Sequence, residues 1–497
     1  MATFAAQLLA FVWTGFAPNV RCRIPSLDGV NGSDYSLPLN QTSSHWYSPP
    51  KEKGQFCQYC SIENVTECSS DISQKCSAGI IFDPETSLVK NTLVIEFDLA
   101  CENAWKRELI LSLPTVGFMV GNLVLSPISD RFGRRPVLLG SAVMFILICF
   151  SLPWANNYYA YAFLETVMGA FGSGVTTTLF IIYMEMVNEP SRTVGGIWYQ
   201  GLFTVGLLYL CLVASLVHDW HLIQLFMALP TLFLILYYWL MPESTRWLII
   251  AGKTEEAEKA IEKSALLNGV YIPKVVIRKE IADARRAISA ETKSRSTVVD
   301  LFRSGSTLLS TTLIVFYNWF AVAMAYYGLT QNTEDLPGNP YVTFSLSAVS
   351  ELPGLLISII IMQRLGRKMA LISLLGIGGI GCVLSGLIPN AKTLVVVLAL
   401  LGKMCVSGAF AVVYNYSAEV FPTVVRQSGL GYACSIARLG SIAAPQIHLL
   451  GDYVNEWLPI VIYGAVSILA AALDLFLPET KDKQLPESIE EAANFGK

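Results

Sequence analysis

The chain has 497 residues, of which 53% are hydrophobic and only 14% are charged, and its mean hydropathy is +0.50. In soluble domains about a quarter of the residues are charged. This composition therefore indicates a multi-pass membrane protein and argues against a soluble enzyme. The net charge of −4, without a basic patch interleaved with aromatic residues, argues against a nucleic-acid partner.

The chain begins with an apolar stretch, residues 4–18, that is short for a membrane span of about 20 residues. We interpret residues 1–20 as a truncated first transmembrane helix. A cleaved signal peptide would have a similar length, but the basic residues that normally precede its apolar core are missing.

A polar segment, residues 21–106, contains six of the eleven cysteines together with three glycosylation sequons. Clustered cysteines indicate a disulfide framework in an extracellular loop, although the sequence does not determine their pairing. A zinc site is the competing interpretation, because Cys57 and Cys60 have ligand spacing; the sequons favour the extracellular loop. The disulfide candidates are Cys22, Cys57, Cys60, Cys68, Cys76 and Cys101, and the glycosylation candidates are Asn31, Asn40 and Asn64.

The rest of a first half, residues 107–241, contains five apolar spans, near 109–128, 136–155, 160–187, 195–217 and 222–241. Small residues such as Gly169, Gly172 and Gly174 gather in the third of these spans. We expect them to let helices approach closely, rather than to contact a ligand. A polar segment, residues 242–306, has charges at helical spacing and is predicted to form short helices on the cytoplasmic face.

The second half, residues 307–477, repeats this plan with six predicted spans, near 307–329, 341–362, 369–388, 393–417, 427–450 and 457–477. A polar tail, residues 478–497, follows it. The predicted fold is therefore an all-α membrane protein with twelve transmembrane helices in two six-helix halves and a Cys-rich extracellular loop. Both termini are expected to lie in the cytoplasm.

A basic turn with a central glycine occurs at the same place in both halves. It reads Asp130-Arg131-Phe132-Gly133-Arg134-Arg135-Pro136 in the first half and Gln363-Arg364-Leu365-Gly366-Arg367-Lys368 in the second. Short basic loops are retained in the cytoplasm, and glycine permits a tight backbone turn. The recurrence indicates an internal duplication of six helices, with two unrelated basic loops as the alternative.

Ionisable residues inside apolar spans are the most informative candidates, because charge in the bilayer is costly and usually lines a pathway or is paired. Arg438 lies in mid-span among small residues and could hold a carboxylate through two parallel hydrogen bonds. The alternative is a structural ion pair with Glu351. Glu351 itself, beside a Pro-Gly pair expected to break the helix, could meet a substrate cation or a coupling ion, or serve only structure. Glu165 is close enough to the end of its span to be interfacial.

Aromatic residues form a second set of candidates. One span carries Tyr317, Trp319, Phe320, Tyr326 and Tyr327, and another carries Tyr414 and Tyr416. Trp319 and Tyr326 are seven residues apart and share a helix face, where aromatic rings could attract an ammonium group. Packing is the alternative for such a stripe. The substrate-binding candidates are Arg438, Glu351, Trp319, Tyr326, Tyr414 and Gln200.

The sequence contains no set of residues typical of catalysis. A GxxxxGK[ST] phosphate loop is missing, and His45, His218, His221 and His448 are not spaced as metal ligands. We therefore expect no enzyme activity, no metal and no cofactor, although sodium or proton coupling stays open.

The basic turns resemble those of the major facilitator superfamily of transporters, in which each half has such a loop after its second helix. Nearly the whole chain from residue 13 onward also resembles the organic ion transporter family of solute carriers, which includes organic cation, organic anion and carnitine transporters. Sugar porters share some of these motifs but lack the Cys-rich loop. The similar stretches are that loop and residues 242–248, 318–320, 326–329, 351–354 and 418–426.

This resemblance implies a substrate class. At the position of Arg438, the cation transporters of the family carry Asp, whereas the anion and carnitine branches carry Arg. Residues 402–426 look closest to the carnitine branch, so we hypothesise a zwitterionic substrate with its carboxylate at Arg438 and its ammonium at Glu351 and the aromatic residues. The chain departs from the family at Glu165, where Arg is typical. An organic anion exchanger is one alternative, and a receptor without transport is another.

The resemblance also implies alternating access in the plasma membrane, with the lipid bilayer and a small organic ion as partners; the oligomeric state is not readable. Basic residues of the two turns are expected to pair with carboxylates and to brace the cytoplasmic side. The residues predicted for this cytoplasmic gate are Asp130, Arg131, Arg134, Arg135, Glu185, Arg192, Glu243, Arg364, Arg367, Glu419 and Arg426.

Overall fold

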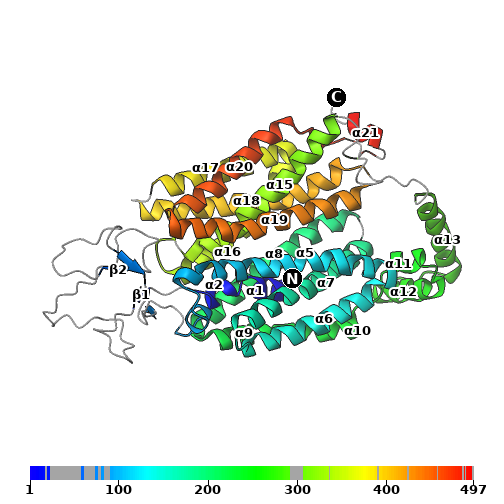
Figure 1. Ribbon diagram of the computed structural model, residues 1–497. Helices are drawn as coiled ribbons and strands as arrows, with labels where there is room; N and C mark the ends of the chain where they lie inside the picture. Colours follow the sequence, from blue (N-terminus) through cyan, green and yellow to red (C-terminus); the bar gives the residue numbers. More distant parts are fainter. Residues whose placement is uncertain are drawn as a thin grey trace.

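The computed structural model describes residues 1–16, 20–22, 58–60, 73–75, 80–82, 90–187, 189–291, 301, 306–334, 336–388, 391–422, 425–455, 457–483, 486 and 489–494. Nearly all of the described chain is helical, as the apolar spans predict. Long helices lie side by side in two groups, one from each half of the sequence (Figure 1).

The first half comprises α1 (Ala2–Leu8), α2 (Phe11–Thr14), α5 (Ala104–Phe132), α6 (Arg134–Ser151), α7 (Tyr158–Met186), α8 (Glu189–Leu216) and α9 (Trp220–Ala228), which continues through the 3-10 helix η3 (Leu229–Leu236) into α10 (Tyr237–Leu240). The second half comprises α15 (Ser306–Gln331), α16 (Pro340–Leu365), α17 (Arg367–Leu387), α18 (Lys392–Val420), α19 (Arg426–Tyr453) and α20 (Leu458–Leu473), with η5 (Asp474–Phe476) after it.

Ten helices of the described chain are long and apolar enough to cross a membrane. The stretch Ala2–Thr14 is a shorter apolar helix, and the 28-residue α19, which carries Arg438, is not among the ten. Ten of the twelve predicted spans therefore meet both criteria, and the total of twelve stays a prediction. The Pro-Gly pair at residues 353–354 does not break α16, which continues from Pro340 to Leu365, so that expectation was wrong.

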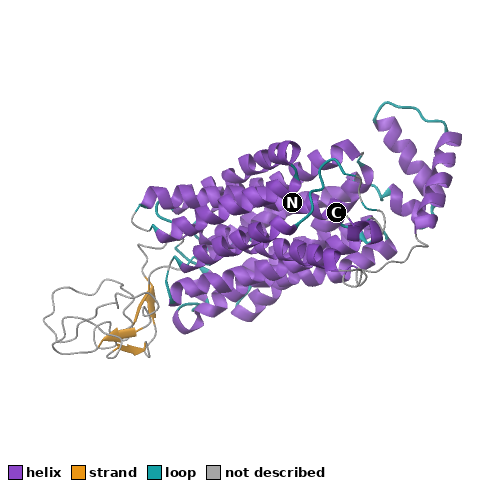
Figure 2. Cartoon of the chain, turned by 90° about the horizontal axis from the view of Figure 1, so that it is seen from above, coloured by secondary structure: helices purple, strands orange, loops and turns teal. Residues whose placement is uncertain are grey.

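The two ends of the molecule differ in character (Figures 1 and 2). At one end, which we call the loop end, β1 (Val20–Cys22) pairs with β4 (Ile80–Phe82) and β2 (Gln58–Cys60) pairs with β3 (Ser73–Lys75), both antiparallel. The short α4 (Leu93–Glu96) leads from there into α5. These short strands lie within the segment predicted as the Cys-rich loop, so the helical prediction applies to the long elements outside it.

The predicted disulfide framework lies largely outside the described residues, as do Asn31, Asn40, Asn64, Cys57, Cys68 and Cys76. Cys101, at the end of the loop, is disulfide-bonded. Cys149, Cys211, Cys382, Cys405 and Cys434 are free thiols on the long helices. Cys101 therefore differs in chemical state from the five cysteines of the long helices.

At the opposite end, which we call the basic-turn end, lie the two Gly-centred turns and the helices α11 (Thr245–Ile250), α12 (Thr254–Leu267) and α13 (Lys274–Glu291). These three helices share a small apolar core of their own, formed by Trp247, Leu248, Ile249, Ala257, Ile277 and Ile281. Their outer faces are charged, and Arg278 pairs with Glu258 at 2.8 Å. The alternation of charge along this segment thus belongs to amphipathic helices.

Glycine allows a close contact in the first half between α5 and α7. A Cβ atom added at Gly169 would overlap the carbonyl oxygen of Pro114, and one at Gly117 would overlap that of Thr166. Neighbouring Gly172 and Gly174 also have side chains packed against them. The packing role predicted for the small residues of this span is confirmed, since only a missing side chain lets these two backbones approach so closely.

Candidate functional site

The candidate site lies between the two halves, where α5 of the first half packs against α19 of the second. Arg438 of α19 places its guanidinium carbon 4.2 Å from the centre of the Phe118 ring of α5. Its Nη1 donates a hydrogen bond of 3.3 Å to the hydroxyl of Tyr327 on α15. Arg438 is therefore held by one ring from each half, and neither ring carries a charge.

Arg438 has no charged partner within the described part of the chain. No carboxylate of those residues lies within 4.0 Å of its guanidinium, and its Nε is buried without a hydrogen-bond partner. The side chain is half-buried, so it is not sealed away. The alternative of an ion pair with Glu351 is thus wrong. A positive charge between apolar helices with a donor to spare is suited to an anionic group.

Glu351 is paired instead with Lys403, a residue that sequence reasoning missed. Lys403 Nζ lies 3.2 Å from Glu351 Oε1, and the two residues are only 1% and 4% exposed. The pair can form because α16 and α18 approach closely at Gly354. A Cβ at that position would overlap the carbonyl oxygen of Met404. The available signal in the sequence was a lone basic residue in one apolar span and a lone acidic residue in another.

The Glu351 carboxylate also joins the two halves. Its Oε1 accepts a hydrogen bond of 2.7 Å from Tyr326, and its Oε2 accepts one of 2.8 Å from Thr204 of α8, in the first half. Thr204 is 1% exposed, so this bond lies in the interior between α8 and α16. Glu351 is consequently a buried carboxylate with partners in both halves of the chain.

An aromatic cluster of the second half adjoins these charges. Trp319 meets Tyr414 edge to face at 4.4 Å between ring centres, and Tyr326 meets Phe410 at 5.7 Å. The indole N–H of Trp319 donates to the Ser417 hydroxyl at 2.9 Å. Trp319 and Tyr326 are buried, whereas Tyr414 and Phe410 are half-buried. The helix face shared by Trp319 and Tyr326 is therefore covered by the rings of Phe410 and Tyr414, which are themselves partly exposed.

Two further residues of the first half lie in contrasting positions. Gln200 is half-buried on α8, and none of the hydrogen bonds among the described residues involves its amide. Glu165 is only 2% exposed, within α7 and near Tyr161 and Cys149. Glu165 therefore lies on the face of α7 that packs inside the first half, whereas Tyr159 and Phe163 of the same helix are exposed, and its depth in the membrane stays a prediction.

Contacts between the halves continue from the site towards the loop end. Trp13 of α2 stacks on Tyr341 of α16 at 4.6 Å, and the hydroxyl of Ser112 on α5 donates to the carbonyl of Ile442 on α19 at 3.2 Å. Nearby, His448 Nδ1 lies 3.6 Å from Glu108 Oε1 across the same helix pair. The two halves are thus joined by side-chain contacts from the site to the loop end.

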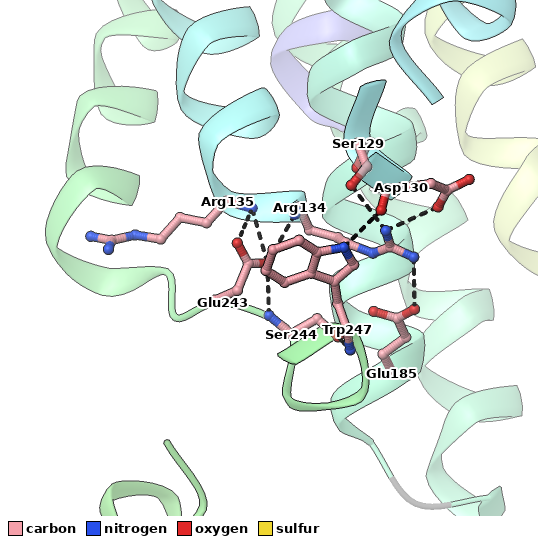
Figure 3. Close-up of polar contacts among 8 residues, drawn as sticks. All are labelled: Ser129, Asp130, Arg134, Arg135, Glu185, Glu243, Ser244 and Trp247. Carbon is pink, nitrogen blue, oxygen red and sulfur yellow. Dashed lines mark hydrogen bonds and ion pairs between the residues drawn. The ribbon is translucent and has the colours of Figure 1, made fainter. Parts of the chain in front are cut away.

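The first basic turn is organised by a carboxylate that accepts backbone N–H groups (Figure 3). Gly133 has φ of +109°, a conformation that other residues resist. The Glu243 carboxylate accepts hydrogen bonds from the backbone N–H groups of Arg134 at 2.9 Å and Arg135 at 3.2 Å. Trp247 donates its indole N–H to the carbonyl of Asp130 at 2.8 Å. Glu243 therefore secures the start of α6.

The Arg134 side chain makes the ion pairs of this turn. Its guanidinium lies 2.9 Å from Asp130 and 3.4 Å from Glu185 of α7 (Figure 3). Arg135 donates to the carbonyl of Tyr238 at 2.7 Å, whereas Arg131 is exposed over the ring of Phe132. The predicted residues Asp130, Arg134, Glu185 and Glu243 are therefore together. Nothing is described for the side chain of Arg192.

The second turn repeats these contacts with different residues. Gly366 has φ of +96°, and the Glu479 carboxylate accepts from the backbone N–H groups of Arg367 at 2.9 Å and Lys368 at 3.1 Å. Arg367 pairs with Glu419 at 2.8 Å. The carbonyl of Arg364 accepts from Lys481, and the side chain of Arg426 is not described. Glu479 was missed, although its likeness to Glu243 after a proline was visible in the sequence.

Among the described residues, no three His, Cys, Asp or Glu side chains gather as metal ligands would. The arrangement instead offers an unpaired cation, an engaged carboxylate and a set of aromatic rings between two similar halves. Such a site can bind and orient a small organic ion, and it contains no nucleophile paired with a base.

Comparisons with known proteins identify the family of the chain. Residues 54–492 match the model of the family described as sugar (and other) transporter. The chain is 34% identical to an organic cation transporter protein of Drosophila melanogaster, over 99% of this chain and 90% of that protein. It is 29% identical to organic cation/carnitine transporter 2 of Homo sapiens, over 97% and 87% respectively.

Solved structures share the fold. The xylose transporter XylE from E. coli in an inward-open conformation superposes with a TM-score of 0.61 at 18% identity, covering 79% of this chain and 91% of that one. A structure of the same proton:xylose symporter with a bound sugar analogue, described as a member of the major facilitator superfamily, also gives a TM-score of 0.61 at 18% identity over 80% of this chain and 90% of that one. At this level of identity the similarity concerns the architecture of helices alone.

Proposed function

This chain belongs to the sugar (and other) transporter family, and from that premise we propose that it carries small organic ions with a carboxylate group, carnitine-like zwitterions first among them. The family is one of major facilitator transporters, so the protein is a membrane carrier and not an enzyme. The choice of substrate is our proposal, and the unpaired guanidinium of Arg438 is the observation that carries it.

Arg438 provides the part of the proposed site that binds the carboxylate of the substrate. A guanidinium binds a carboxylate through two parallel N–H groups, and here the half-buried side chain has one hydrogen bond within the described chain, from Nη1 to Tyr327. A positive charge in the interior of a membrane protein is costly unless it is neutralised, so a bound carboxylate recovers part of that cost. Phe118 beneath the guanidinium leaves the plane of its N–H groups available to the substrate.

The aromatic cluster provides the second arm. The half-buried rings of Tyr414 and Phe410 could receive a quaternary ammonium group on their faces, with Trp319 fixing Tyr414 from behind. This assignment differs from the expectation for Glu351, whose carboxylate is already paired with Lys403. A purely anionic substrate is the second candidate, and the occupied Glu351 is the observation that favours it.

The contacts between the halves support alternating access. They extend from Thr204 and Glu351 at the centre to Trp13 and Tyr341 at the loop end. By contrast, the ion pairs of Arg134 and Arg367 stay within their own halves. We propose that the structure is closed at the loop end, and that transport requires the Thr204–Glu351 bond and the outer contacts to separate as the halves rock.

The first prediction tests transport itself. Purified protein reconstituted in liposomes is expected to take up radiolabelled L-carnitine with saturation, and unlabelled carnitine should compete with it. Uptake of tetraethylammonium, a cation without a carboxylate, should be at least about tenfold lower, because one charge-assisted interaction is missing. Benzoate tests the second candidate. A flat time course for carnitine and benzoate, with intact protein in the liposomes, would contradict the proposal.

The second prediction concerns orientation in the plasma membrane. We propose that the loop end is extracellular and that both termini and the basic turns are cytoplasmic, because short basic loops are retained inside. Treatment of cell-surface protein with peptide N-glycosidase is expected to increase its electrophoretic mobility. The triple Asn→Gln variant at positions 31, 40 and 64 should migrate like the treated protein. A wild-type mobility unaffected by the enzyme would contradict glycosylation of this loop.

A further inference from the structure

We propose that Lys403 determines the charge selectivity of the carrier by permanently occupying the Glu351 carboxylate, so that the site accepts anionic and zwitterionic solutes and rejects simple organic cations. This inference rests on the proposed function, because it concerns which ions the same site accepts. It identifies a specificity-determining residue that does not need to contact the substrate itself.

The Lys403 ammonium group is saturated by acceptors of the second half. It donates to Glu351 Oε1 at 3.2 Å, to the backbone carbonyl of Tyr326 at 3.2 Å and to the Thr330 hydroxyl. An ammonium group has three N–H donors, so each has an acceptor here. Nζ also lies 3.3 Å from the centre of the Tyr326 ring. With 1% of the residue exposed, Lys403 has neither a free donor nor access to a substrate.

Glu351 is correspondingly closed to a substrate cation. Both carboxylate oxygens are engaged here, Oε1 by Lys403 and Tyr326 and Oε2 by Thr204. The Thr204 bond separates as the halves rock, whereas Lys403 and Tyr326 belong to the same half as Glu351 and stay with it. Only 4% of the residue is exposed. A substrate ammonium would have to displace a resident ammonium that has the same charge and already has good geometry. The Glu351 carboxylate, which could otherwise bind a substrate cation, is therefore paired with Lys403.

The charges that remain define the preference. Lys403 and Arg438 contribute two positive charges and Glu351 one negative charge, so the three residues together carry a net charge of +1. Arg438 is half-buried and has no carboxylate partner among the described residues, so its charge is both uncompensated and accessible. In a poorly solvated interior, a simple cation would add to this charge, whereas a carboxylate neutralises it.

Removing the charge of Lys403 abolishes this excess of positive charge. Breaking a buried ion pair leaves the other charge without compensation, and a mobile cation can then supply it. In a Lys403→Gln variant, the Glu351 carboxylate would lose its ammonium partner. The net charge of the three positions would fall from +1 to zero. Organic cations should then bind, while the carboxylate arm at Arg438 stays intact.

The experiment compares uptake of tetraethylammonium, L-carnitine and benzoate by reconstituted full-length protein. Lys403→Gln is expected to raise tetraethylammonium uptake by at least about tenfold relative to wild type, the effect of one charge-assisted interaction. Lys403→Arg, which keeps the charge, should keep the wild-type order of preference. The double variant Lys403→Gln/Glu351→Gln should lose the gain. Lys392→Gln, at a lysine of the same helix that is not buried, is the matched control.

A Lys403→Gln protein that enters liposomes with wild-type selectivity would overturn the inference. If that variant does not fold, a Glu351→Gln variant tests whether Glu351 binds the ammonium group of the substrate. Lys403 stays charged in this variant, so uptake of both benzoate and carnitine is expected to persist. Loss of carnitine uptake with benzoate uptake unchanged would show that a substrate ammonium uses Glu351, and would also overturn it. A wild-type protein that moves none of the three probes contradicts the proposed function instead.

Discussion

An Arg438→Asp variant is expected to lose uptake of carboxylate-bearing substrates by about 10- to 150-fold and to gain uptake of organic cations. The loss corresponds to about 1.5–3 kcal/mol for a hydrogen-bonded charged group. The gain follows from charge, because the substitution replaces the one accessible cation of the described site by an anion, next to the aromatic rings of the second half. Uptake of L-carnitine, benzoate and tetraethylammonium into liposomes measures both effects.

Two controls make this result specific. Arg438→Lys keeps the positive charge but loses the planar pair of donors, so it should weaken carboxylate uptake without admitting cations. Arg286→Asp reverses the charge of an exposed arginine on α13 and should leave the order of substrates as it is in wild type. An Arg438→Asp protein with unchanged selectivity would show that the guanidinium does not bind the solute, and would contradict the substrate proposal.

A Gly169→Val variant is expected to yield little or no folded carrier. The added side chain would overlap the backbone of Pro114 on α5, and backbone cannot move aside as a side chain can. Overpacking of a core costs about 1–3 kcal/mol even where side chains can adjust, so here the cost should reach or exceed the upper value. Size-exclusion chromatography in detergent and the thermal unfolding midpoint report the loss.

Gly140→Val is the matched control for this prediction. Gly140 lies on α6, in a transmembrane helix of the same half, and a Cβ there has no atom within 4 Å. We expect this variant to elute and unfold like wild type. If Gly169→Val behaved like Gly140→Val, the close approach of α5 and α7 would not be required for the fold.

Local sequence carries most of what could be predicted about the fold. The long helices follow apolar runs, and the turns at Gly133 and Gly366 follow from glycine and arginine side by side. Glycines in an apolar span also identify close packing without knowledge of the partner helix, as Gly169 shows. These features depend on a few consecutive residues, which is why one sequence is enough to find them.

The partners of buried charges could not be predicted in the same way. Glu351 and Lys403 are 52 residues apart and meet only because α16 and α18 pack closely at Gly354. Phe118, which lies beneath Arg438, comes from the opposite half of the chain. The burial of Glu165 depends in the same way on which face of α7 its neighbours cover. Contacts between distant segments are set by tertiary packing.

The two basic turns share one design, yet they are not equally strong. Glu243 and Glu479 secure both helix starts, but among the described residues Arg134 pairs with two carboxylates, whereas Arg367 pairs with Glu419 alone, because Gln363 stands where the first half has Asp130. The indole ring of Trp247 caps the first turn, and the flexible amine of Lys481 caps the second. We therefore expect the first turn to resist separation from its neighbouring helices more strongly than the second.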